Sequence, residues 1–365
     1  MWSRINVLIN SRLRAQIAKE FLSILRDPRS RLIVFVPPLM QLLIFTFATT
    51  LEVRNAEIAV YDRDAGQWSQ ELVARVGAAD FISRLHTVHS RDELRELIDG
   101  RKVIAGLDMG PTFSRDIAAG GTGTAQVIVD GRRSNAGQIT VGYLNAIAAD
   151  VGTNARKESQ RASPVVVRHW FNPNLIYRWF VVPALSGILV FFSALMITSL
   201  SIARERELGT FDQLLVSPTT TPEIIVAKTV PAVAIGAVLG LMMIAAAAFL
   251  FGVPFTGSFL LLLPSLLLFI LSVVGIGLMI SAVSATQQQA ILGAFAIGVP
   301  AVLMSGFATP VENMPLALQW MAQGIPLTHF LIIVEGTFLK AMTASDIVAN
   351  TWPLAVIALV TLTMA

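Results

Sequence analysis

The sequence contains no cysteine among its 365 residues. This absence excludes disulfide bonds, thiol nucleophiles and metal sites built from cysteine thiolates, and it leaves both reducing and oxidising compartments open. Charged side chains are scarce as well, at 14% against 54% hydrophobic residues. That balance is far too apolar for an ordinary soluble protein of this length. The composition therefore indicates a membrane protein.

The common catalytic signatures are also missing. The chain has no Gly-x-x-x-x-Gly-Lys-Ser/Thr phosphate loop, no His-Glu-x-x-His zinc motif and no Gly-x-Ser-x-Gly nucleophile elbow. His86 and His89 stand three apart in a strand-like stretch, where their side chains would point to opposite faces. We therefore expect no catalytic, cofactor-binding or metal-binding residues in this chain.

Positive charge is concentrated at the N-terminus. Residues 1–31 carry seven Lys or Arg against Glu20 and Asp27, so the rest of the chain is slightly acidic although the whole carries +3. This distribution argues against a nucleic-acid partner. Apolar residues recur among the basic ones, a pattern typical of a helix in the cytoplasmic headgroup region. Residues 32–51 are uncharged and long enough to cross about 30 Å of hydrocarbon, which predicts a first span with a cytoplasmic N-terminus.

The composition becomes that of a soluble domain over residues 52–175. Short strand-like runs alternate there with helical patterns, the runs being 58–61, 103–107 and 125–129 and the helices 69–76 and 91–98. This alternation predicts an α/β module. Because the module follows the first span, we expect it on the extracytoplasmic side.

Further uncharged runs predict the remaining spans. Residues 179–203 form a second span, and residues 229–311 contain no ionisable side chain, a length that suits three more. Turn-forming clusters divide that stretch, which gives predicted spans at 223–251, 258–284 and 289–308. Small residues in these spans favour a packed helix bundle.

The last part of the chain is hydrophobic but interrupted. Residues 309–346 contain prolines and charges that make a poor crossing, so we expect a re-entrant or interfacial hairpin. Residues 347–365 predict a sixth span, which ends without a basic tail and is expected to be incomplete. The predicted fold is a polytopic α-helical membrane protein with six transmembrane helices, an N-terminal interfacial helix, a re-entrant hairpin and an α/β extracytoplasmic domain between the first two spans.

A charged amphipathic stretch lies at residues 203–218, between two apolar runs. Read as a helix, it places Leu208, Phe211 and Leu214 on one stripe and most of its charges on the others. Such a stretch suits either a solvated connector or a handle for another protein. The run Arg-Glu-Arg-Glu-Leu-Gly-Thr-Phe-Asp-Gln-Leu, followed by Ser-Pro, resembles the cytoplasmic coupling segment of ABC-2 type transporter permeases. Asp212 departs from the family pattern, which usually has Glu there.

A second resemblance to the same family lies near the C-terminus. The run Ser305-Gly306-Phe307 and the run from Pro310 to Pro315 resemble its outward-facing half-helix hairpin. The residues of this hairpin that we single out are Pro310, Glu312, Met314, Pro315, Pro326 and Glu335. Glu335 is a departure, because many members of the family have Arg at that position.

The resemblance covers nearly the whole chain and implies a function. It implies the permease subunit of an ATP-driven exporter in the bacterial inner membrane, with residues 52–175 in the periplasm, as in the drug-efflux group. A separate ATPase would bind ATP and Mg²⁺, a second permease copy would complete the transporter, and a periplasmic adaptor often joins such systems. It implies ATPase contact at Glu205, Glu207, Gly209, Thr210 and Leu214. It also implies a substrate path between the second and fifth spans, at Thr198, Ser201, Gly298 and Ser305.

Two other readings compete with this one. A membrane-anchored sensor or assembly factor could use its external domain to bind a partner, although a glycine-rich bundle is more than an anchor needs. A secondary transporter usually carries buried ionisable residues for ion coupling, and residues 229–311 have none. The substrate of an exporter with such an uncharged bundle is expected to be hydrophobic or amphipathic.

Overall fold

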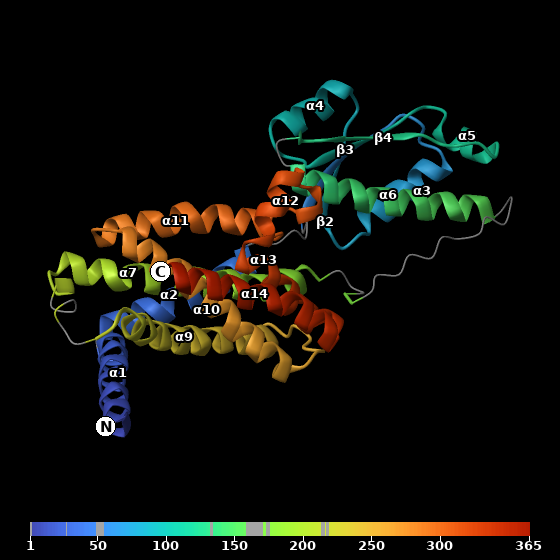
Figure 1. Cartoon of the computed structure of the whole chain (residues 1–365). Helices are drawn as coiled ribbons and strands as arrows, with labels where there is room; N and C mark the ends of the chain where they lie inside the picture. Colours follow the sequence, from blue (N-terminus) through green and yellow to red (C-terminus); the bar gives the residue numbers. More distant parts are fainter. Residues whose placement is uncertain are drawn as a thin grey trace. The chain divides into compact units, whose positions relative to one another are not determined.

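The computed structural model describes residues 2–26, 28–48, 55–131, 134–157, 171–172, 176–212, 216 and 219–365. The chain divides into two compact units, each with a hydrophobic core of its own (Figure 1). The helical unit comprises Met1–Ala48 and His169–Ala365. The α/β unit comprises Thr49–Arg168, so it is inserted between two parts of the helical unit.

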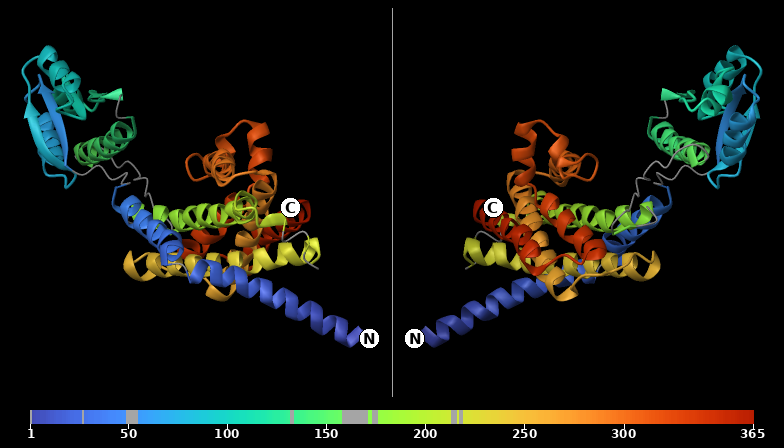
Figure 2. Two further views of the ribbon diagram at one scale, coloured as in Figure 1. Left: turned by 90° about the vertical axis from the view of Figure 1, so that its left-hand side faces the viewer. Right: turned by 90° about the vertical axis from the view of Figure 1, so that its right-hand side faces the viewer.

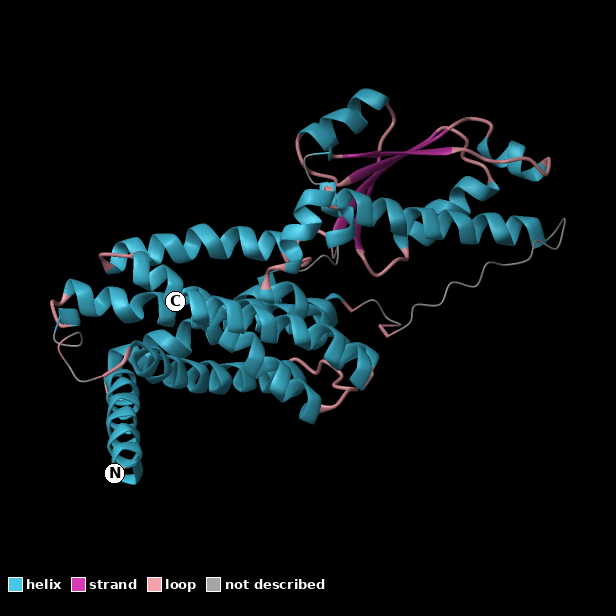
Figure 3. Ribbon diagram, in the orientation of Figure 1, coloured by secondary structure: helices cyan, strands magenta, loops and turns pink. Residues whose placement is uncertain are grey.

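The α/β unit is a four-stranded sheet with helices packed on it (Figure 3). The strand order is β2-β1-β3-β4, with β1 parallel to β2 and β3 and with β4 antiparallel to β3. Its elements are β1 (Ala56–Asp62), α3 (Gln67–Gly77), β2 (Ile82–Thr87), α4 (Arg91–Asp99), β3 (Ala105–Met109), α5 (Phe113–Ala118), β4 (Ala125–Val129) and α6 (Ser134–Lys157). The sheet lies within the region 52–175 in which the sequence predicts an α/β module.

The two faces of this sheet bury different helices, because successive side chains of a strand point to opposite faces. Ile58 of β1 packs on one face with Leu72 of α3 and Leu144 of α6. Ala59, the next residue, packs on the other face with Leu94 of α4. The unit is therefore three layers with the sheet in the middle.

The helical unit contains the long apolar helices. Its elements are α1 (Trp2–Leu25), α2 (Pro28–Ala48), α7 (Tyr177–Glu207), α9 (Thr221–Ala245), the π-helix η2 (Ala246–Leu250), α10 (Phe259–Val283), α11 (Gln287–Met304), the 3₁₀ turn η3 (Val311–Asn313), α12 (Leu316–Gln323), α13 (Pro326–Glu335), the π-helix η4 (Gly336–Lys340) and α14 (Ala344–Met364). Helices α7, α9 and α10 lie side by side in both views, and α1 leaves the bundle at one end (Figure 2).

Five helices of the described residues are long and apolar enough to cross a membrane: α7, α9 with η2, α10, α11 and α14. A sixth crossing results if α12 and the α13–η4 segment count as one broken span. The first span predicted at 32–51 is not among these five helices. Helix α2 starts at Pro28, so Arg29 and Arg31 occupy its first turn, and its apolar part is the shorter stretch Val34–Phe47.

Helix α10 is the centre of the bundle, packing against both α7 and α14. Gly277 permits the close approach of α7, since a Cβ there would overlap the Thr198 hydroxyl. On the side of α14, the hydroxyl oxygens of Ser265 and Thr351 lie 2.8 Å apart, and the Ser272 hydroxyl donates to the Leu354 carbonyl at 2.7 Å. Small and hydroxylated residues thus hold three long helices together.

The segment predicted as a hairpin is bent by 80° between α12 and α13. Helix α13 is buried in the bundle, where Phe330 stacks on Phe269 of α10 with ring centroids 4.2 Å apart. Helix α12 is mostly exposed, with Trp320 at 74%. A broken span and a re-entrant loop both have this geometry.

Candidate functional site

Helix α7 ends inside the predicted coupling segment, in a Schellman motif. Gly209 has a left-handed φ of 70°. The Thr210 N–H donates to the Glu205 carbonyl at 2.9 Å, and the Gly209 N–H donates to the Arg206 carbonyl at 3.1 Å. The expectation of one helix through residues 203–218 is therefore wrong. Glycine is the usual residue at this position of a helix end, so the sequence contained the signal for the break.

Glu205 lies in a buried network of charges rather than on the surface. The ammonium group of Lys228, on α9, lies 3.0 Å from Glu205 and 3.4 Å from Glu20 of α1. Lys19 of α1 reaches the other oxygen of Glu205 at 3.3 Å. The Lys228 side chain is 3% exposed, so its charge depends on these carboxylates for compensation. The network joins α1, α7 and α9.

The next two residues of α7 connect it to the ends of two other helices. Arg206 donates to the carbonyls of Ala282 and Ser284, at 2.6 and 3.2 Å, where α10 ends. The Glu207 carboxylate accepts the N–H of Gln287 at 2.8 Å, where α11 begins. A cation at a helix C-terminus and an anion at an N-terminus both complement the helix dipole. We call this set of contacts, made by Glu205, Arg206 and Glu207, the coupling junction.

The predicted ATPase-contacting residues therefore fall into two groups. Glu205 and Glu207 make contacts within the chain, whereas Gly209 and Thr210 are exposed beyond the end of α7. Leu208, which was not predicted as a contact, is exposed beside them. Leu214 lies outside the described residues. Sequence reasoning missed Lys228 as a partner of this segment, although its position at the edge of a long uncharged run was a signal.

The predicted path residues do not gather at one place. Thr198 is buried against α10, and a Cβ on Gly298 of α11 would meet Phe192 and Leu195 of α7, so both serve packing within the chain. Ser201 is half-buried on α7. Ser305 is buried after the end of α11 and lines a cavity.

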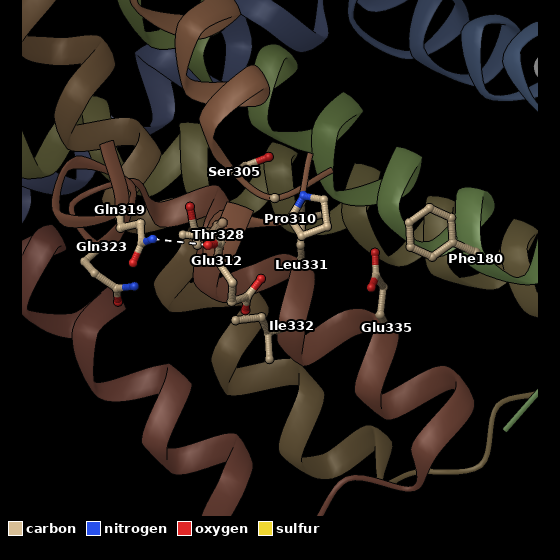
Figure 4. Close-up of a pocket in the computed structure, with 12 residues that line it drawn as sticks. Phe180, Ser305, Pro310, Glu312, Gln319, Gln323, Thr328, Leu331, Ile332 and Glu335 are labelled. Atoms are coloured by element: carbon tan, nitrogen blue, oxygen red, sulfur yellow. Dashed lines mark hydrogen bonds between the residues drawn. The ribbon is translucent and has the colours of Figure 1, made fainter. Parts of the chain in front are cut away.

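That cavity, which we call the hairpin pocket, has a volume of about 350 Å³ (Figure 4). It lies between the start of α7, the end of α11 and the segments η3, α12 and α13. Its polar lining comes from Ser305, Glu312, Gln319, Gln323, Thr328 and Glu335. Apolar walls are supplied by residues such as Phe180 and Leu331. This volume lies at the lower end of the range of small-molecule sites, roughly 300–1,000 Å³.

The hairpin residues have distinct places around this pocket. Pro310, Glu312 and Glu335 line it. Met314 does not line it, and the Met314 carbonyl accepts a hydrogen bond from the Gln319 side chain at 2.9 Å. Pro315 precedes α12 and Pro326 is the first residue of α13, so both prolines start helices. Gln319 belongs to a run, Gln319-Trp320, that also resembles the family's hairpin, and Gln323 lies in the predicted hairpin at 309–346, but neither was singled out as a site residue. Phe180 was not predicted to take part, because its helix meets the hairpin only in the folded chain.

Metal ligation finds no support among the described residues, in which no group of three His, Asp or Glu side chains is placed to hold an ion. His86 pairs instead with Glu57 on the neighbouring strand, at 2.6 Å. This hydrogen bond lowers the pKa of the Glu57 carboxyl group. His329 contacts the Gln323 carbonyl at 2.9 Å.

Comparison with known proteins identifies the family of this chain. The profile of the ABC-2 family transporter proteins matches residues 29–365. The chain is 41% identical to the probable multidrug ABC transporter permease YbhR of Escherichia coli K12 over 348 residues, 95% of each protein. It is 28% identical to the probable multidrug ABC transporter permease YbhS of that strain, over 93% of this chain and 91% of the relative. ABC transporter G family member 20 of Dictyostelium discoideum is 24% identical over 89% of this chain and 46% of its own length. The chain therefore belongs to the ABC-2 family of transporter proteins.

Proposed function

We propose that this chain is the transmembrane permease subunit of an ATP-driven exporter. It moves a hydrophobic or amphipathic substrate out of the cytoplasm or the inner membrane by alternating between conformations. The similarity to YbhR and YbhS, which are named probable multidrug ABC transporter permeases, supports this proposal. ATP and Mg²⁺ are bound by a separate ATPase subunit, because the sequence carries no nucleotide-binding signature.

The observation that carries this proposal is the coupling junction. Leu208 and Thr210 are exposed, while the three residues before them are tied to α1, α9, α10 and α11. A force applied at the exposed end of α7 would therefore act on four other helices. Coupling between sites requires such physically connected elements. This arrangement suits a docking point for the ATPase.

Charge supports the orientation in the membrane. We place the N-terminus and the coupling junction in the cytoplasm and residues 52–175 in the periplasm, following the excess of basic residues in residues 1–31. The contact of Lys19 with Glu205 supports this arrangement, because it brings α1 and the end of α7 together. The inner membrane of a bacterium is the location proposed.

A second permease copy, identical or different, completes the proposed transporter. Helix α11 is largely uncovered within the chain and exposes Leu292, Phe295 and Leu303. We propose that this face lies toward the second copy, with Ser305 near the substrate path. A periplasmic adaptor would bind residues 52–175.

Cross-linking tests the docking point. Since the chain has no cysteine, single cysteines can be introduced without background. We expect Leu208→Cys and Thr210→Cys to cross-link to the co-expressed ATPase, because both positions are exposed beyond the end of α7. Arg95→Cys is the matched control, since its side chain is 81% exposed on α4 in the proposed periplasmic domain.

The outcome separates the proposal from its alternatives. Cross-links at positions 208 and 210, with none at 95, support cytoplasmic docking at the coupling junction. Cross-links at 95 with none at 208 and 210 would overturn both the orientation and the docking point.

A further inference from the structure

Among the described residues, the hairpin pocket is lined by acidic side chains and by no basic one. Of its twelve lining residues two are acidic, Glu312 and Glu335, and none is basic. Across the described ranges neither carboxylate forms an ion pair, and the nearest histidine of α13, His329, contacts a backbone carbonyl instead. Glu312 is exposed at the edge and Glu335 is half-buried on α13 (Figure 4). Acidic residues at membrane depth are costly and usually serve a function.

A second and independent observation points to a ligand. Thr328 lines the same pocket, is 3% exposed, and its hydroxyl has no hydrogen-bond partner in the part of the chain that the structure describes. Buried polar groups are nearly always satisfied, by protein, water or ligand. Within the described part of the chain, the pocket therefore combines a buried hydroxyl group without a hydrogen-bond partner with two carboxyl groups that form no ion pair.

The other lining residues indicate which kind of ligand would fit the pocket. Phe180, Leu331 and Ile332 offer an apolar wall, and the Phe180 ring lies parallel to that of Phe307, with centroids 6.4 Å apart and an interplanar angle of 6°. Aromatic rings and carboxylates together favour organic cations. A bare metal ion fits less well, because no third His or acidic side chain joins Glu312 and Glu335 among the described residues.

We propose that the hairpin pocket binds a cationic amphipathic molecule. Its positive group lies near Glu335 and Glu312, and its apolar body lies against Phe180, Leu331 and Ile332. The assignment of this ligand as the transported substrate rests on the proposed function. The binding itself does not, because the pocket is formed by this chain alone.

Equilibrium binding to the purified full-length chain in lipid nanodiscs, without ATPase, tests this proposal. The probes are tetraphenylphosphonium and tetraphenylborate, which share size and shape and carry opposite charges. The variants are Glu335→Gln and Glu312→Gln, with Glu335→Asp to retain the charge. Glu96→Gln, an exposed change on α4, controls for net charge, and gel filtration reports on folding.

We expect the native chain to bind the cation and to bind the anion at least tenfold more weakly. Glu335→Gln should weaken cation binding about tenfold, whereas Glu335→Asp and Glu96→Gln should retain it. Absence of cation binding by the native chain, equal binding of both ions, or unchanged binding by both Glu335→Gln and Glu312→Gln would each overturn the proposal. Displacement of the phosphonium ion by millimolar sodium or calcium would also overturn it in favour of an inorganic ion. The cross-linking outcome at positions 208 and 210 is independent of all these results.

Discussion

The ammonium group of Lys228 is buried between the carboxylates of Glu205 and Glu20, and Lys228 directly precedes the uncharged residues 229–311. Its side chain is 3% exposed, whereas those of Glu205 and Glu20 are 13% and 19% exposed. Desolvation makes such a network a weak source of net stability, but removing one partner leaves the others uncompensated. The network adds a polar connection between α1, α7 and α9 to the packing of α1 against α9.

Replacing Lys228 with methionine should destabilise the protein. We expect a loss of roughly 1–3 kcal/mol, because two carboxylates would stay partly buried without a counter-charge. Thermal unfolding in detergent measures the effect, and the double variant Lys228→Met with Glu205→Gln should recover part of it. Lys19→Met is the control, since that side chain is 61% exposed and its pairing is worth little. Equal melting temperatures for Lys228→Met and Lys19→Met would contradict the role assigned to Lys228.

Helix ends decide the geometry of the coupling junction. Helix α7 has 31 residues and stops at Glu207 because Gly209 adopts a left-handed φ that allows the Schellman motif. Helix α9 begins in a similarly defined way, where the Glu223 carboxylate accepts the N–H of Thr220 at 2.8 Å. The span predicted at 223–251 begins two residues after Thr221, the first residue of this helix.

Gly209→Ala should impair coupling by straining this helix end. A Cβ there would meet no atom, so the cost is the left-handed backbone, about 1–2 kcal/mol. Gly120→Ala is the matched control, because Gly120 also has a positive φ, of 79°, and open space, but lies in the α/β unit. We expect both variants to lose similar stability and Gly209→Ala alone to reduce ATP turnover of the complex with its ATPase. Equal turnover in the two variants would show that the end of α7 does not transmit the signal.

Elements were more predictable from the sequence than the contacts between them. The breaks between α9, α10 and α11 follow from clusters of Gly, Pro, Ser and Gln, and the predicted bounds of α10 differ by one residue at each end. The pairing of Glu20 with Lys228 joins residues 208 apart, which no local pattern reveals. The hairpin pocket was missed for the same reason, since five segments meet there. The prediction of a single helix over residues 203–218 was wrong, because it took Gly209 only as part of the family's motif. It did not consider that glycine readily adopts the left-handed φ that ends a helix.

At the scale of the whole molecule, α7 connects the two candidate sites. Phe180 in its first turn lines the hairpin pocket, and Glu205, Arg206 and Glu207 in its last turn form the coupling junction. At 1.5 Å per residue these positions are roughly 40 Å apart. Helix α7 is buried along most of its length, so a displacement at one end can reach the other through the helix and its packed neighbours. This connection is how energy released by a separate ATPase would reach a ligand in the pocket.

Transport of a fluorescent amphipathic dye in proteoliposomes tests this account most directly. Purified permease would be reconstituted alone and together with its ATPase, and ATP hydrolysis and dye movement would be measured in the same vesicles. The account predicts neither activity for the permease alone, and ATP-dependent dye movement with hydrolysis when both subunits are present. Hydrolysis by a permease preparation shown to be free of ATPase subunits, or hydrolysis by the complex that never moves any amphipathic dye, would contradict it.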